Sequence, residues 1–139
     1  MTRVGKIVPA KIAMHENEIS EKIIGCAIEA HKALGPGLLE SAYEECLAAE
    51  MEACGLHFER QQPIPLVFRD VKLDCGYRVD FLVEEKVIVE LKAIDVVPPV
   101  VYAQILTYAR LLDKRLGLLI NFHVQQLSKG IKRIVNNLL

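Results

Sequence analysis

The sequence lacks several patterns that would indicate a well-known chemistry. It contains no glycine-rich phosphate-binding loop, no Ser-His-Asp constellation, no internal repeat and no low-complexity segment. Its formal net charge is only -1, which argues against the uniformly basic surface of a protein that coats DNA, although it leaves room for a local basic cleft. Any contact with nucleic acid must therefore be confined to one part of the surface.

Cysteine is present without the spacing that zinc sites or redox motifs use. Cys26, Cys46, Cys54 and Cys75 form no CxxC pair and no cluster with histidine. The first two stand in apolar helical segments, where a buried free thiol is the more frequent state. We therefore expect all four cysteines to be reduced and none to bind zinc.

Long apolar runs are missing from the start of the chain. Residues 1–14 mix arginine and lysine with valine and isoleucine and offer no stretch suited to a signal sequence or a membrane span. Residues 1–16 show no sustained period, so we expect a flexible N-terminal arm followed by a single domain over residues 17–139. A cytoplasmic protein that makes no membrane contact is the corresponding expectation.

The middle of the sequence predicts a β-hairpin over residues 76–93, with a turn at residues 84–86. Because side chains alternate along a strand, one face should be apolar. Its members are Tyr77, Val79, Phe81 and Val83 on the first strand and Val87, Val89, Leu91 and Ala93 on the second. The opposite face then carries Asp80 across from Glu90 and Lys92.

Two carboxylates and a lysine in this arrangement suit hydrolysis of a phosphodiester bond. Asp80 and Glu90 offer the hard oxygen ligands that Mg²⁺ prefers, and Lys92 can orient the attacking water and neutralise developing charge. The alternative is structural: a cross-strand salt bridge from Lys92 to either carboxylate on a solvated face of the sheet.

The remaining elements follow from apolar periodicity and from glycine and proline. Helices are expected over residues 19–34, 38–54, 100–112 and 129–139, and strands over residues 58–62, 64–68 and 116–121. Ser20 is a candidate cap of the first helix and Gly35 its stop, while Pro63 and Pro65 indicate an edge strand or a bulge. This order of elements predicts an α/β fold in which a mixed central sheet is flanked by helices.

Two helical faces carry further candidate site residues. Glu40, Tyr43 and Glu44 share a face at the start of the second helix, where a carboxylate also suits the helix dipole whether or not it binds anything. Gln104 and Tyr108 lie four residues apart on one face of the third helix. A polar residue beside a core tyrosine is the plainer interpretation of that pair.

These motifs together resemble a known superfamily. Asp80 followed by Glu90-Leu91-Lys92 resembles the D…(D/E)xK signature of the PD-(D/E)XK nucleases, although Val79 replaces the proline before the aspartate. Residues 37–43 spell GxxExxY and resemble the small family named after that motif, which is assigned to the same superfamily. Residues 104–108 resemble the QxxxY motif that accompanies the core in related families.

The resemblance implies a restriction-endonuclease-like core and a Mg²⁺-dependent nuclease acting on nucleic acid, with Mn²⁺ as a substitute ion. It assigns Asp80, Glu90 and Glu40 to the metal and Lys92 to the attacking water, with Tyr43, Gln104 and Tyr108 in supporting positions. A non-catalytic nuclease-like domain that binds nucleic acid or a protein partner is the alternative.

Two further expectations concern the surface. Members of the GxxExxY family tend to carry a histidine just before the glutamine of the third helix, and Val101 stands there in this chain. A group for proton transfer or phosphate contact is therefore missing. Apolar surface near Pro63 and Pro65 and at Leu138-Leu139 predicts a homodimer, which a small nuclease needs to cut both strands of a duplex.

Overall fold

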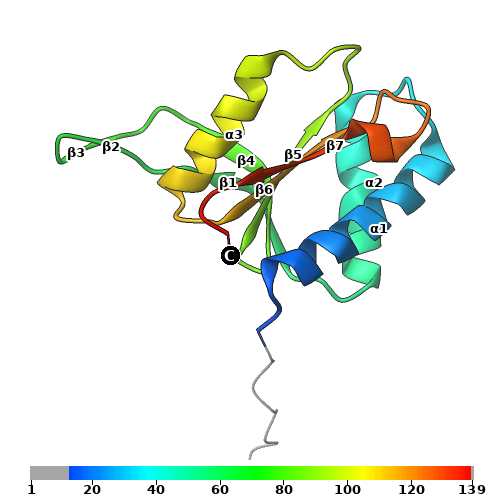
Figure 1. Ribbon diagram of the computed structural model, residues 1–139, viewed down its shortest axis with the longest axis horizontal. Helices are drawn as coiled ribbons and strands as arrows, with labels where there is room; N and C mark the ends of the chain where they lie inside the picture. The colour runs from blue at the N-terminus through cyan, green and yellow to red at the C-terminus, as the bar shows by residue number, and fades with distance from the viewer. Residues whose placement is uncertain (1–12, 139) are drawn as a thin grey trace, which may run out of the picture.

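The chain begins with two helices and then alternates strands with one further helix (Figure 1). The computed structural model describes residues 13–138, so most of the predicted N-terminal arm lies outside the described residues, as does residue 139. The elements in chain order are α1 (Glu16–Leu34), α2 (Glu40–Ala53), β1 (Phe58–Pro63), β2 (Leu66–Phe68), β3 (Val71–Leu73), β4 (Arg78–Val83), β5 (Val87–Lys92), α3 (Pro99–Leu111), β6 (Leu116–Asn121), the 3-10 helix η1 (Leu127–Gly130) and β7 (Ile131–Val135).

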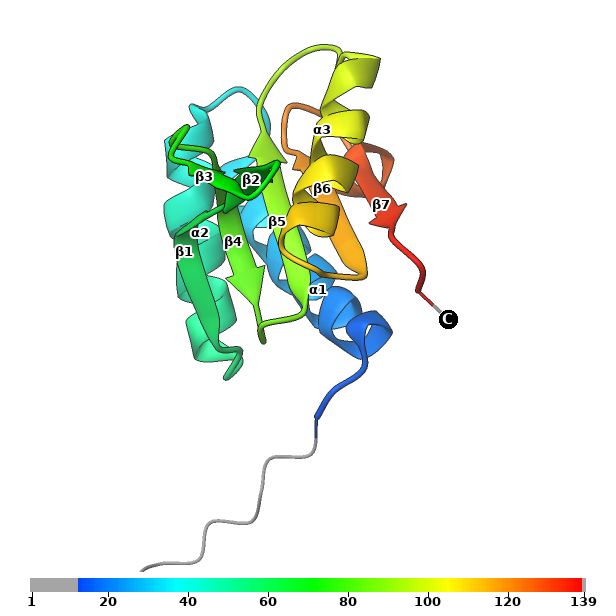
Figure 2. The ribbon, with the colours of Figure 1, turned by 90° about the vertical axis from the view of Figure 1, so that its left-hand side faces the viewer.

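Five of the strands form one mixed sheet in the order β1-β4-β5-β6-β7. The β5–β6 pair is parallel and the other three pairs are antiparallel. Helices α1 and α2 cover one face of this sheet and α3 covers the other (Figure 2). The predicted α/β fold, with a mixed central sheet flanked by helices, is confirmed.

Helix α1 presents a continuous apolar stripe to the sheet, because Ile19, Ile23 and Ala27 recur every four residues and are fully buried. It starts one turn earlier than expected, with the His15 side chain accepting the N–H of Asn17. Ser20 is therefore inside the helix, and its prediction as a cap is wrong; the stop at Gly35, with φ of 67°, is confirmed. No described helix is both long and apolar enough to cross a membrane.

Strand β6 lies at the centre of the packing between the helical layers. All six of its residues are buried, as expected for a strand covered on both faces and reached through a helical crossover. Gly117 lets α3 approach closely, since a Cβ atom there would lie 2.7 Å from Cγ2 of Ile105. The strand predicted over residues 116–121 is confirmed.

The predicted helix over residues 129–139 is wrong, because the chain forms β7 there and pairs with the open edge of β6. Ile131 packs toward the α1 and α2 layer, whereas Ile134 packs with Ile105 on the α3 side. Apolar residues three apart suit a helix face, but they also suit a strand that is covered on both faces. The β-branched side chains and the free edge of β6 favour the strand.

The hairpin of β2 and β3 projects away from the body of the molecule (Figure 1). Its apolar side chains are largely exposed, with Val67, Phe68 and Val71 at 58%, 61% and 56%. Strand β1, which ends at Pro63, is an edge strand, as the prolines indicated. Leu138, by contrast, packs against the main core, so the predicted apolar surface at that residue is wrong.

Candidate metal centre

Strands β4 and β5 stop pairing partway along their length, and two carboxylates occupy the gap between them. Regular pairing ends at Phe81 and Val89. Beyond that point the Asp80 N–H donates to Oε1 of Glu90 at 2.9 Å, and the Leu91 N–H donates to Oδ2 of Asp80 at 2.8 Å. Each carboxylate accepts a backbone N–H that a regular ladder would direct to a carbonyl, so the two acidic residues fasten the strands together.

Side-chain alternation along β4 changes at the same place. Phe81 packs toward α1 and α2, whereas Val79 packs with Ile88 and Tyr108 on the α3 side. The prediction that Val79 and Phe81 share a face is therefore wrong. The break occurs where β4 leaves its ladder with β5, and the neighbouring strand is also irregular there, with Gln61 at φ of 52°.

Glu90 is more deeply placed than Asp80 or Glu40, with only 9% of the residue exposed. Burial, followed by repulsion from Asp80, raises the pKa of its carboxyl to about 8. The Asp80 N–H and the charge of Lys92 act in the opposite direction but do not cancel this rise. A proton or a cation is therefore favoured at this position near neutral pH.

Asp80 and Glu40 belong to the same electrostatic cluster. Burial raises the pKa of Asp80, while the hydrogen bonds from Leu91 and Gln61 lower it. The pKa of Glu40 is raised by partial desolvation and next by the charge of Asp80, although the residue as a whole is exposed at the start of α2. Helix α2 thus adds a third carboxylate, Glu40, which interacts electrostatically with Asp80 and Glu90 on the sheet.

Lys92 influences these carboxylates without pairing with one of them. Its charge lowers the pKa values of Asp80, Glu90 and Glu40. Within residues 13–138, however, Lys92 forms no ion pair or side-chain hydrogen bond. The structural alternative, a cross-strand salt bridge from Lys92 to Asp80 or Glu90, is absent from this part of the chain.

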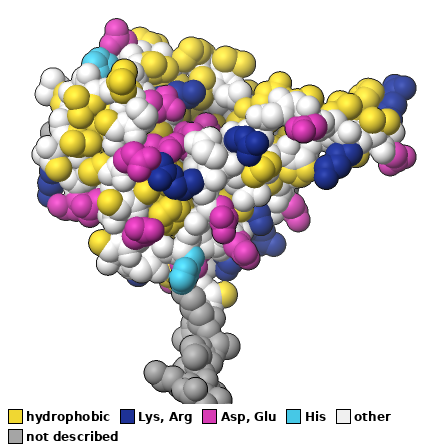
Figure 3. All heavy atoms as spheres, turned by 180° about the vertical axis from the view of Figure 1, so that it is seen from behind, with side chains coloured by type: hydrophobic (Ala, Val, Ile, Leu, Met, Phe, Trp, Pro, Cys, Tyr) yellow, Lys and Arg dark blue, Asp and Glu magenta, His cyan; other side chains and the backbone are white. Residues whose placement is uncertain are grey.

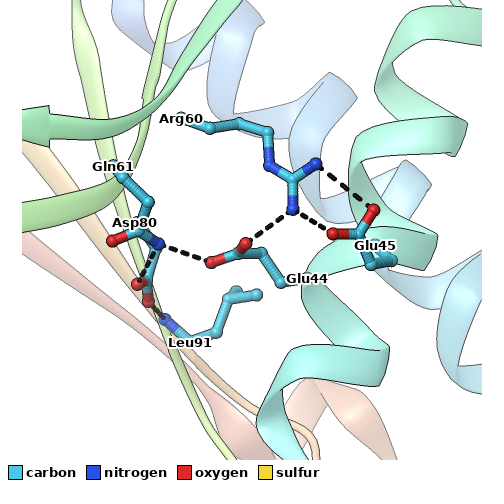
Figure 4. A network of polar contacts seen from close by, with 6 residues as sticks. All are labelled: Glu44, Glu45, Arg60, Gln61, Asp80 and Leu91. Carbon is cyan, nitrogen blue, oxygen red and sulfur yellow. Dashed lines mark hydrogen bonds and ion pairs between the residues drawn. The ribbon is translucent and has the colours of Figure 1, made fainter.

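A polar network links the cluster to α2 through residues that the sequence did not single out (Figure 4). The Gln61 amide donates to Glu44 at 2.7 Å and to Asp80 at 3.3 Å. Arg60, from the same strand, pairs with Glu44 and Glu45, each at 2.6 Å. The shared face of Glu40 and Glu44 was visible as helical spacing, but nothing in the sequence indicated that Gln61 would span the distance to Asp80.

The face of the molecule seen from behind carries side chains of both charges (Figure 3). There, acidic side chains gather beside lysine and arginine, close to where the projecting hairpin leaves the body (Figure 3). The surface is therefore of mixed charge at this place, which agrees with the low net charge of the chain.

Comparison with known proteins decides the family. A family model described as the PD-(D/E)XK nuclease superfamily matches residues 17–134. The chain belongs to this superfamily. No curated protein and no solved structure matches it significantly. Membership in the PD-(D/E)XK superfamily indicates a nuclease-like function and, with it, contact with nucleic acid.

In this PD-(D/E)XK chain, Tyr43 holds the loop that leads into α2. The contacts of its side chain are with this loop and with Phe122, and none is with the three carboxylates. Its hydroxyl donates to the Gly35 carbonyl at 2.5 Å and accepts the Leu38 N–H at 3.1 Å. The fully buried ring stacks on Phe122, with centroids 4.4 Å apart. Tyr43 thus positions the segment that precedes Glu40.

Gln104 and Tyr108 border a groove next to the acidic cluster. The groove has a volume of about 480 Å³, and Leu66, Tyr77 and residues of α3 also line it. Tyr108 is buried, and desolvation followed by the charge of Glu90 raises the pKa of its phenol. Tyr108 therefore connects an open apolar surface with Glu90, while Gln104 contacts Tyr108.

Asn121 is a buried residue whose role the sequence did not reveal. Its side-chain amide donates to the Ile94 carbonyl at 2.8 Å, while its oxygen accepts the N–H groups of Ile94 and His123. The adjacent Phe122 N–H donates to the Lys92 carbonyl at 2.9 Å. Asn121 therefore fixes the end of β5, from which Lys92 projects.

The donor set can be tested against a divalent ion, which nucleases of this superfamily generally use. In the described residues, no three acidic, histidine or cysteine side chains are arranged to hold an ion as they stand. The chemistry nevertheless fits: neighbouring carboxylates raise one another's pKa values, and Oε2 of Glu90 accepts no hydrogen bond from a described residue. Hard oxygen donors with unmet negative charge are what Mg²⁺ selects.

Proposed function

We propose that this protein is a Mg²⁺-dependent phosphodiesterase that acts on nucleic acid and is a GxxExxY-type member of its superfamily. Asp80, Glu90 and Glu40 would hold the ion, and Mn²⁺ would substitute for Mg²⁺. A bound divalent ion would supply an activated water and neutralise phosphate charge.

The observation that carries this proposal is the pair of carboxylates in the gap between β4 and β5. A carboxylate of purely structural value gains most from a cation partner, yet Lys92 pairs with neither Asp80 nor Glu90 within the described chain. The two carboxylates instead repel each other. A bound cation would offset this repulsion, which supports a metal site at the pair.

Lys92 would stabilise charge that develops in the transition state and orient the attacking water. Its ammonium is not committed to another described side chain, so it is available for that purpose. Asn121 would position Lys92 by fixing the end of β5. Gln104 would act beside the ion, and Tyr108 would contact the substrate along the groove that both residues border.

Calorimetric titration of the full chain with Mg²⁺ tests this function. One specific site is expected, which Asp80→Asn and Glu90→Gln abolish and the exposed Glu59→Gln retains. Crystals soaked in Mn²⁺ should show the ion between Asp80 and Glu90. A chain that binds no divalent ion and melts at the same temperature with and without Mg²⁺ would overturn the proposal.

A non-catalytic domain that binds nucleic acid or a protein partner is the second candidate. It is favoured by Val101, whose side chain packs beside Ile105 and offers no group for proton transfer. On this alternative, the protein binds oligonucleotide or partner but releases no product when Mg²⁺ is supplied. Product analysis on single-stranded and duplex DNA and RNA separates the two candidates.

The same proposal includes a homodimer. The exposed apolar side chains of the β2–β3 hairpin offer a surface for a second copy, and two copies would bring two sites to a duplex.

A further inference from the structure

Two of the four cysteines lie in contact although they are far apart in the sequence. Sγ of Cys26 in α1 is 3.2 Å from Sγ of Cys54, which caps the C-terminus of α2 and lies 28 residues later. A disulfide needs sulfurs about 2.0 Å apart, so the two atoms would have to close by about 1 Å. Both are free thiols in the structure.

The thiols are also reachable from solvent on one side. Cys54 is exposed and Cys26 is buried. A shallow hollow of about 350 Å³ lies over the two sulfurs and is bordered by Lys22, Gly25 and Glu50. A Cβ atom on Gly25 would meet no other atom within 4 Å, so the backbone next to Cys26 leaves open space.

We propose that Cys26 and Cys54 form a modification site, a thiol pair that low-molecular-weight disulfides oxidise to an intramolecular disulfide between α1 and α2. The exposed Cys54 thiolate attacks a sulfur of the small disulfide, which forms a mixed disulfide and releases one small thiolate. Cys26 then loses its proton to solvent, its sulfur attacks Sγ of Cys54, and the second small thiolate leaves. Two protein thiols are oxidised and one small disulfide is reduced to two thiols.

The environment of the pair sets this order of events. Burial and the contact with Cys54 raise the pKa of Cys26 to about 12, so its thiolate is rare at neutral pH and it serves as the resolving residue. The other two cysteines have no such partner in the described residues: Cys46 packs partly against the core, and Cys75 lies between β3 and β4. The site is therefore specific to one of the six pairings that four cysteines allow.

Formation of the Cys26–Cys54 disulfide should stabilise the fold without altering the acidic cluster. The bond joins residues 28 apart and constrains the unfolded chain, which should raise the melting temperature by roughly 5–10 °C. Cys54 lies at the opposite end of α2 from Glu40, about 20 Å along the helix axis. Affinity for Mg²⁺ should therefore change by less than about twofold, and the test of this site is independent of the proposed nuclease activity.

The experiment equilibrates the full chain with oxidised glutathione, quenches with acid, counts thiols and maps the peptides. Two of four thiols should disappear, joined as Cys26 and Cys54, and the melting temperature should rise. Cys46→Ser, the matched control on the same helix, should form the same bond.

Single variants of the pair separate the two steps. Cys26→Ala should trap Cys54 as a mixed disulfide with glutathione. In Cys54→Ser, Cys26 should stay a thiol, and treatment with oxidised glutathione should not change the melting temperature of this variant. Cys54 is exposed, so this variant tests the site even if a change at the buried Cys26 impairs folding. Four thiols retained by the oxidised wild type, another pairing, or a lowered melting temperature would each overturn the proposal.

Discussion

Asp80 donates its backbone N–H to the carboxylate of Glu90 at 2.9 Å, across the gap where β4 and β5 no longer pair. The carboxylate of Asp80 accepts the N–H of Leu91 in return. The same two side chains therefore hold the strands together and supply the acidic oxygens of the candidate metal centre. Structure and proposed function meet in one pair of residues, and mutations there should have effects of both kinds.

The stability of the metal-free protein should fall as pH rises from about 4.5 to about 8. The pKa of Glu90 is raised from 4.5 to about 8 on folding, so in this window the native state keeps a proton that the unfolded state releases. The free energy of unfolding should decrease with a slope approaching about 1.4 kcal/mol per pH unit, and the raised pKa values of Asp80 and Glu40 act in the same direction. Urea denaturation in chelator at several pH values measures this slope; a stability that increases across the window contradicts the prediction.

Glu90→Gln should remove most of that slope and weaken the response to Mg²⁺. The amide oxygen can still accept the Asp80 N–H, while the charge that repels Asp80 is gone, so the metal-free variant should be at least as stable as the wild type above pH 8. Wild type at an ion concentration about 100 times Kd should gain about 2.7 kcal/mol, and the variant should gain much less. Melting curves with chelator and with Mg²⁺ provide the measurement, with Glu59→Gln as the control.

Lys92→Ala should reduce turnover by roughly 100-fold or more and change nucleic-acid affinity little, because the ammonium acts mainly on charge that forms in the transition state. Its folding stability should fall only slightly, since no described side chain pairs with Lys92 and only its through-space attraction to the carboxylates is lost. Single-turnover cleavage and equilibrium binding separate the two effects. Lys132→Ala, on the exposed face of β7, is the matched control, and equal loss of turnover in both variants would count against a role for Lys92.

Tyr43→Phe should destabilise the protein by about 1–3 kcal/mol, because the Leu38 N–H and the Gly35 carbonyl lose their partner while the stack on Phe122 remains. Urea denaturation at a fixed pH measures the cost. Tyr102→Phe is the control, since that hydroxyl has no hydrogen bond to a described residue. A loss of activity without a loss of stability would instead place Tyr43 in contact with substrate.

Light scattering tests the proposed homodimer. If the chain dimerises, the measured mass at working concentration should be twice 15.6 kDa. Phe68→Ser should shift the protein toward the monomer, because it removes an exposed aromatic side chain from the tip region of the hairpin. A wild-type monomer would remove the dimer from the proposal.

Most of the framework follows from local patterns in the sequence. The stripe of α1 and the run of β6 are long and regular enough to identify their elements. Strand β7 was missed because Ile131 and Ile134 fit a helix face as well as two faces of a strand, and the free edge of β6 decides between them only in three dimensions.

The candidate site was partly predictable for a similar reason. Asp80, Glu90 and Lys92 were identified by type and spacing, but strict alternation could not reveal that β4 changes face at Asp80. Gln61 was missed because its importance depends on an unusual backbone conformation and on two partners from other elements.

The projecting β2–β3 hairpin leaves the central sheet after β1 and returns to it at β4 without adding a strand. Its length and side chains can therefore change while the register of β1 against β4 is preserved. Divergence in this segment would change the exposed apolar surface that it presents and leave the acidic pair unmoved, because the hairpin contributes no strand to the sheet that carries the pair.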